Sequence, residues 1–168
     1  MKLLFRVLLL AALGMLALPG AGQEPSARKM PQAMPKFQLT ALDGSTVNSE
    51  KLPSPKKWLL IYVKPDCGSC AQVLKLVQQD KHPELAPMMT IVVGGTTPDK
   101  LQDMMKGLPA LQAASWYADP SNNMSAALKL PGAPVIFGVR ESTLAWQMMG
   151  MISPDPEKMT SILTSWCK

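Results

Sequence analysis

An apolar run leads directly into a pair of cysteines at residues 58–70, which read Trp58-Leu59-Leu60-Ile61-Tyr62-Val63-Lys64-Pro65-Asp66-Cys67-Gly68-Ser69-Cys70. The first six residues are all apolar, β-branched or aromatic, a pattern typical of a strand covered on both faces. Lys64-Pro65-Asp66 ends this strand. From Cys67 the period changes, because Cys70, Val73, Leu74 and Val77 are spaced as i, i+3, i+4 and i+7. The segment therefore predicts a central strand followed by a helix that runs to about Asp80.

The spacing and position of the two cysteines favour disulfide chemistry. Two intervening residues on the first turn of a helix bring the sulfurs close enough to bond with little movement of the backbone. The N–H groups at the helix N-terminus favour a thiolate, which is the attacking species. We therefore predict that Cys67 is the nucleophile and that Cys70, on the buried stripe, is the resolving thiol.

Other uses of a Cys-x-x-Cys pair fit less well. A haem attachment site needs histidine after the second cysteine, and this chain has Ala71 there. A structural zinc site usually needs four ligands, and the remaining donors, His82 and Cys167, would have to converge from distant elements. A purely structural disulfide stays open, although it would close too short a loop to stabilise the domain much. No metal site is predicted.

The segments on either side complete an α/β pattern. Phe37, Leu39 and Ala41 alternate with polar residues, and Asp43-Gly44 predicts a turn into a second short strand at Thr46-Val47. Downstream we expect strands at 89–93 and 115–118, a helix that begins at Thr97-Pro98 with threonine as its cap, a short helix at 121–128, a hairpin of strands 135–139 and 144–149, and a closing helix from about 155. This order predicts a mixed sheet with helices on both faces and an N-terminal β-hairpin.

The N-terminus predicts export. Residues 1–22 combine Lys2 and Arg6 with an apolar run from Leu8 to Leu18, which is too short for a typical membrane span. We expect cleavage near Gly22, with an uncleaved signal anchor as the alternative. Residues 23–35 are predicted to be a flexible leader, and residues 36–168 a single domain. The predicted location is therefore periplasmic or otherwise extracytoplasmic.

Composition excludes one broad class of partner. After removal of residues 1–22, the chain has 15 basic and 12 acidic residues, a net charge of +3. The lysines are scattered and do not form a basic stripe interleaved with aromatic residues, so nucleic acid is not expected as a partner. Outside the cytosol disulfides form and persist, which makes a redox-active disulfide plausible chemistry for a thiol pair.

Residues 37–166 resemble the thioredoxin superfamily, and more closely its exported redoxin branch of TlpA- and ResA-like proteins. The resemblance lies in the 37–47 hairpin, the central strand, the Cys67–Cys70 motif and Gly132-Ala133-Pro134-Val135. It implies a thiol-disulfide oxidoreductase without an organic cofactor that exchanges disulfides with protein thiols and has a membrane or periplasmic redox partner. It also implies a cis Ala133–Pro134 bond, with the backbone of Ala133 and Pro134 binding an extended substrate peptide.

Three residues depart from the pattern of that superfamily. Asp66 replaces a frequent tryptophan, and its carboxylate opposes thiolate formation at Cys67. The cysteines enclose Gly68-Ser69 instead of Gly-Pro, and Ile61 stands where thioredoxins bury an acidic residue. The sequence therefore does not settle whether the protein reduces or oxidises its targets.

Two further features keep other functions open. Cys167 is expected to be partly exposed, as an unpaired thiol, an intermolecular bridge or a second resolving group. Thirteen methionines suggest Cu(I) ligands, but those in predicted strands and helices fit core packing better. The alternatives to catalysis are therefore a non-catalytic binding or assembly factor of the envelope and a copper-handling protein. The oligomeric state cannot be read from the sequence.

Overall fold

The computed structural model describes residues 28–53, 55–79, 82–150 and 156–168. In these residues the strands form one mixed sheet in the order β1-β8-β7-β4-β5-β6-β2-β3. The strands are β1 (Arg28–Ala33), β2 (Gln38–Thr40), β3 (Thr46–Asn48), β4 (Lys57–Val63), β5 (Met89–Gly94), β6 (Ser115–Asp119), β7 (Val135–Arg140) and β8 (Thr143–Met149). The helices are α1 (Gly68–Gln79), α2 (Pro98–Lys106), α3 (Asn123–Ala127) and α4 (Pro156–Cys167), with short 3-10 helices η1 (Ser49–Lys51), η2 (Pro83–Met88) and η3 (Pro109–Leu111).

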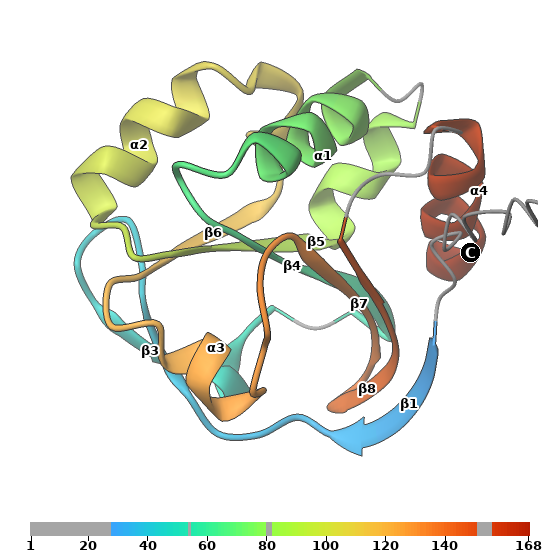
Figure 1. Ribbon diagram of the computed structural model, residues 1–168, viewed down its shortest axis with the longest axis horizontal. Coiled ribbons are helices and arrows are strands. Elements are labelled where there is room, and N and C mark those ends of the chain that lie inside the picture. The colour runs from blue at the N-terminus through green and yellow to red at the C-terminus, as the bar shows by residue number, and fades with distance from the viewer. Residues whose placement is uncertain (1–27, 54, 80–81, 151–155) are drawn as a thin grey trace, which may run out of the picture.

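Strand β4 lies in the middle of the sheet, parallel to β5 and antiparallel to β7. Its side chains alternate between two apolar clusters: Leu59, Ile61 and Val63 pack with residues of α1, α2 and α4, whereas Leu60 and Tyr62 pack with residues of α3. Figure 1 shows α1 and α2 on one side of the sheet and α3 on the other. The uninterrupted apolar run thus reflects burial on both faces, as predicted.

The predicted α/β class, with helices on both faces and an N-terminal hairpin, is confirmed. Strands β2 and β3 pair antiparallel with Leu39 opposite Val47, and Gly44 takes a φ of 84° in the turn between them, a value that favours glycine. Strands β7 and β8 form the predicted second hairpin. One detail is wrong: Thr97 occupies the N-cap position of α2, but its hydroxyl makes no capping hydrogen bond.

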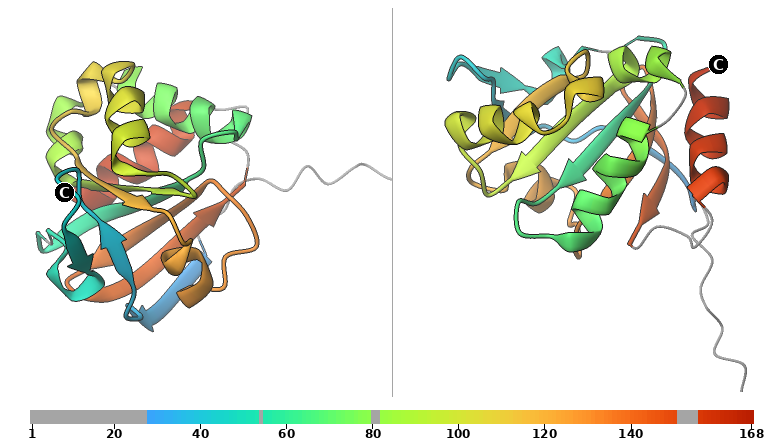
Figure 2. Two further views of the ribbon diagram at one scale, coloured as in Figure 1. Left: turned by 90° about the vertical axis from the view of Figure 1, so that its left-hand side faces the viewer. Right: turned by 90° about the horizontal axis from the view of Figure 1, so that it is seen from above.

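Residues 28–35 are the described part of the predicted flexible leader at 23–35, and most of them lie in a strand. Residues 28–33 form β1, an edge strand that pairs antiparallel with β8 (Figure 2). The register shifts between Lys29 and Gln32, so Pro31 lies where the ladder is irregular and its missing N–H is tolerated. Pairing at a sheet edge uses backbone groups, which explains why this strand carries no apolar periodicity in the sequence.

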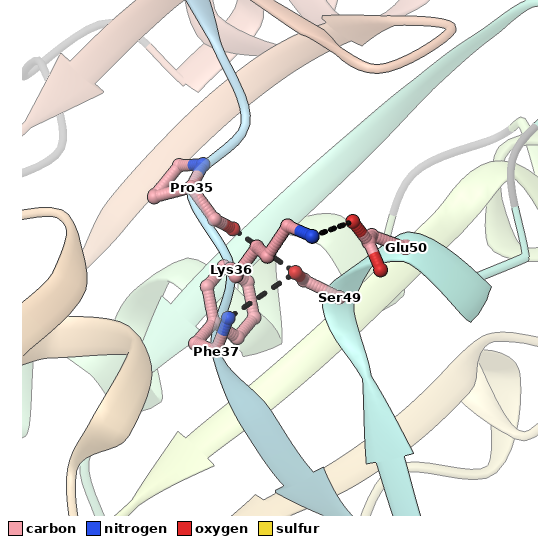
Figure 3. Close-up of polar contacts among 5 residues, drawn as sticks. All are labelled: Pro35, Lys36, Phe37, Ser49 and Glu50. Atoms are coloured by element: carbon pink, nitrogen blue, oxygen red, sulfur yellow. Dashed lines mark hydrogen bonds and ion pairs between the residues drawn. The ribbon is translucent and has the colours of Figure 1, made fainter.

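Ser49 fixes the crossing from β1 to β2, as Figure 3 shows. The buried Ser49 hydroxyl donates a hydrogen bond to the Pro35 carbonyl at 3.0 Å and accepts one from the Phe37 N–H at 3.2 Å. Beside it, Lys36 and Glu50 form an exposed ion pair at 2.9 Å, which contributes little to stability. The Ser49 hydroxyl thereby satisfies backbone groups between two strands that do not pair with each other.

The predicted signal segment, residues 1–22, lies outside the described residues. Among the residues that the structure does describe, no helix combines the length and apolar character needed to cross a bilayer.

Gly138 provides a test of the packing between the two strands of the β7–β8 hairpin. A Cβ at this position would collide with the indole of Trp146, the residue opposite it on β8. We expect Gly138→Ala to lower the free energy of unfolding by about 1–3 kcal/mol, the usual cost of overpacking, as measured by urea denaturation. Gly132→Ala is the matched control, because a Cβ there meets nothing within 4 Å. Equal stabilities for the two variants would contradict this packing.

Candidate active site

Cys67 stands between the end of β4 and the first turn of α1, in the position of an N-cap residue. Its carbonyl accepts the first helical hydrogen bond, from the Ala71 N–H at 3.0 Å. Its sulfur accepts a hydrogen bond from the Cys70 N–H at 3.2 Å. An N-cap serine or aspartate uses its side-chain oxygen in the same way. The sulfur therefore lies among the N–H groups that favour negative charge.

The two cysteines form a disulfide, with their Cα atoms 5.1 Å apart. They differ in environment: Cys67 is partly exposed, whereas Cys70 is fully buried in the apolar cluster beneath α1. That cluster also contains Ile61, so an aliphatic side chain occupies the position where the resemblance leads one to expect an acid. Only one of the two sulfurs is accessible to a macromolecular thiol.

The loop before β7 lies against the disulfide. The Ala133–Pro134 peptide bond is cis, and the Ala133 carbonyl oxygen is 3.6 Å from Cys67 Sγ. The Pro134 carbonyl accepts a hydrogen bond from the Gly150 N–H at 3.2 Å, which ties the loop to the end of β8. The structure thus brings Cys67, Cys70, Ala133 and Pro134 together, while the role of the last two in substrate binding stays a prediction.

Asp119 is a buried carboxylate that no pattern in the sequence singled out. It is fully buried at the end of β6, where its carboxylate accepts hydrogen bonds from the Asn123 N–H at 2.7 Å and the Met124 N–H at 3.0 Å. Burial raises the pKa of this carboxyl, and the two N–H donors act in the opposite direction. The contacts hold the start of α3, from which the chain returns to Ala133.

Cys167 lies at the opposite end of the sheet from the disulfide. The positive charge of Lys57, at the start of β4, lowers the pKa of the Cys167 thiol electrostatically. The same ammonium lies 5.7 Å from the ring of the neighbouring Trp166. The indole N–H of Trp166 also donates to the Trp58 carbonyl at 3.1 Å. Because Cys67 follows the other end of this seven-residue strand, about 20 Å separates the two sites. Cys167 is therefore too far away to be a second resolving group in the same chain.

The methionines that suggested copper are divided between core and surface. Met89 and Met148 are buried and pack in the apolar core, as do Met124 and Met159, whereas Met149 is 38% exposed. Met151 lies outside the described residues. Buried thioethers of this kind fill gaps in a core.

Comparisons with known proteins place the fold. No protein-family model and no curated protein matches the sequence. Among solved structures, a secreted disulfide oxidoreductase of Mycobacterium tuberculosis is 14% identical with a TM-score of 0.62, and the match covers 77% of this chain and 95% of that chain. A thio-disulfide isomerase of Thermus thermophilus is 17% identical with a TM-score of 0.60, over 83% and 97% of the two chains.

A third match is the exposed lipoprotein thioredoxin of Streptococcus pneumoniae, 16% identical with a TM-score of 0.55, over 77% of this chain and 98% of that chain. At these identities the likeness concerns the fold, and it shows that this chain has a thioredoxin-like fold. The resemblance that the sequence suggested for residues 37–166 is thereby confirmed at the level of the fold.

The environment of Cys167 predicts a poorly reactive thiol. Burial raises its pKa from the ordinary 9.0 to about 11, which Lys57 only partly opposes. At pH 8 we expect iodoacetamide to alkylate Cys167 about 100-fold more slowly in the native than in the unfolded protein, as followed by mass spectrometry. Because the folded pKa is the higher one, the thiol's contribution to stability is lost as pH rises from about 9 to about 11. Equal rates in the two states would contradict this assignment.

Proposed function

We propose that this chain, which has a thioredoxin-like fold, is an exported thiol-disulfide oxidoreductase acting on protein substrates through Cys67 and Cys70. One observation carries the proposal: a partly exposed sulfur at a helix N-terminus is bonded to a fully buried sulfur one turn further along. This arrangement gives the two thiols different roles, because a substrate can reach only Cys67.

The exchange requires no atoms beyond the sulfurs of the two proteins. In the reduced protein the Cys67 thiolate attacks a target disulfide, a bond forms between Cys67 and one target sulfur, and the other target sulfur leaves as a thiolate. Cys70, as a thiolate, then attacks Cys67, which restores the Cys67–Cys70 disulfide and releases the second target thiolate. The target gains two electrons and the pair loses two. The reverse sequence oxidises a target dithiol.

The loop opposite the disulfide is the proposed binding region for the substrate. The Ala133 carbonyl is already beside Cys67 Sγ, and Gly150 holds the Pro134 carbonyl from the other side. An extended peptide bound along Ala133 and Pro134 would bring its own cysteine to Cys67. Backbone contacts of this kind tolerate many side chains, which suits an enzyme that acts on several proteins.

The pair itself carries the two electrons, so the reaction requires no organic cofactor. Each turnover leaves the pair in the opposite redox state, and a second thiol-disulfide protein must restore it. We assign that role to a membrane or periplasmic redox partner, because the predicted signal segment at residues 1–22 indicates export.

A trapping experiment tests this function. Cys70→Ala removes the resolving thiol, so substrates attached to Cys67 should accumulate as mixed disulfides. We expect bands of higher mass on non-reducing gels of cells that express this variant, and we expect dithiothreitol to remove them. The same gel of a Cys67→Ala/Cys70→Ala variant should show none.

Cys167→Ala in the Cys70→Ala background is the second control, and its trapped species should be unchanged because Cys167 lies at the far end of the sheet. Loss of the bands in this control, or their persistence without Cys67, would overturn the assignment of Cys67 as the nucleophile.

Export and processing are tested separately. The N-terminal sequence of protein recovered from the producing cell's envelope fraction should begin near residue 23, after cleavage near Gly22. Recovery of the chain with residues 1–22 intact and in the membrane fraction would support the signal-anchor alternative instead.

A further inference from the structure

Ser69 lies within hydrogen-bonding distance of the accessible sulfur. Its Oγ is 3.3 Å from Cys67 Sγ, and the residue is partly buried in the first turn of α1. In the disulfide, Cys67 Sγ carries no hydrogen, so the Ser69 hydroxyl must be the donor. A serine in a helix often returns its hydroxyl to a backbone carbonyl of the preceding turn. Here the hydroxyl contacts the reactive sulfur instead.

Donors and an acceptor compete for this sulfur. The Ser69 hydroxyl and the Cys70 N–H, at 3.2 Å, both favour a negatively charged sulfur. The Ala133 carbonyl, at 3.6 Å, is an acceptor and therefore favours the protonated thiol. The nearest charged residues along the chain, Lys64 and Asp66, are both exposed, and the facing loop at 131–134 contains no charged residue. Solvent therefore weakens the opposing effects of these two charges, and the groups that contact Cys67 Sγ are uncharged.

We propose that Ser69 is a positioning residue that stabilises the Cys67 thiolate; this inference rests on the proposed function, since it concerns the same pair. A hydrogen bond to a thiolate is charge-assisted and stronger than one to a neutral disulfide sulfur. Ser69 thus stabilises the reduced, ionised form relative to both the thiol and the disulfide. Cys67 is therefore a better leaving group in mixed disulfides. Because the reduced form is stabilised, the Cys67–Cys70 disulfide is also a stronger oxidant. Gly68 has no side chain that could do the same.

The test is Ser69→Ala in the full-length mature chain, and alanine also favours the helix. In the reduced protein, iodoacetamide alkylation of Cys67 is followed against pH, with the Cys67 peptide quantified by mass spectrometry. We expect the midpoint to rise by about one pH unit, the effect of losing one charge-assisted hydrogen bond. Ser69→Thr keeps the hydroxyl, so its midpoint should stay close to that of the wild type. Gln72→Ala, exposed on the same helix, should leave the midpoint unchanged.

The redox equilibrium with glutathione provides a readout that a purely structural role would not produce. At a pH above the Cys67 alkylation midpoints of both the wild type and Ser69→Ala, the substitution should shift the equilibrium toward the Cys67–Cys70 disulfide by up to about tenfold, or about 30 mV. Well below both midpoints the difference should vanish, because Cys67 is then protonated in each. An unchanged alkylation midpoint, or a redox difference that persists at every pH, would overturn the role of Ser69.

This outcome can be separated from failure of the proposed function. A wild-type chain that traps protein partners while Ser69→Ala leaves the Cys67 midpoint unchanged refutes Ser69 alone. If Ser69→Ala raises the Cys67 midpoint but the wild-type chain traps no protein partner, the role of Ser69 stands and the proposed action on protein substrates is refuted.

Discussion

The hydrogen bond from the Cys70 N–H to Cys67 Sγ is the contact on which the rest of the site depends. It makes the sulfur the N-cap group of α1, so one atom both completes the helix and carries the reactivity. A thiolate in that position is stabilised by the N–H groups of the first turn. The same contact points Cys70 inward, because the third helical residue lies over the core. The asymmetry between an accessible and a buried sulfur follows from where the helix begins.

The sheet supports this junction from both faces. Strand β4 alternates its side chains between two apolar clusters, which holds it in the middle of the sheet, and α1 begins five residues after β4 ends at Val63. Strand β7 pairs with β4, with Val135 opposite Tyr62, so the loop that precedes β7 lies near the C-terminal end of β4. Asp119 holds the start of α3 on the far side of that loop. The approach of the Ala133 carbonyl to Cys67 is thus a consequence of sheet register.

Local sequence patterns predict much of this arrangement. The remainder depends on contacts between segments that are distant in the sequence. The apolar run at 58–63, the stripe from Cys70 to Val77 and the alternation around Leu39 predicted β4, α1 and the N-terminal hairpin, because each pattern reports burial directly. Strand β1 was missed because backbone pairing at an edge leaves no periodicity. The burial of Asp119 and the approach of the Ala133 carbonyl to Cys67 depend on which segments of the fold meet, and only the family resemblance pointed to the loop of Ala133. The contact between Ser69 and Cys67 is local, but the spacing of two residues does not show which way a hydroxyl turns.

Titration of the two cysteines in the reduced protein tests the central claim most directly. With 13C-labelled cysteine, the Cβ shifts of Cys67 and Cys70 report each protonation step separately. The account predicts that Cys67 titrates at the lower pH and that Cys70, buried among apolar side chains, titrates well above the ordinary pKa of a cysteine. If Cys70 ionised first, or the two thiols titrated together near that ordinary value, the helix N-terminus would not set the roles of the pair.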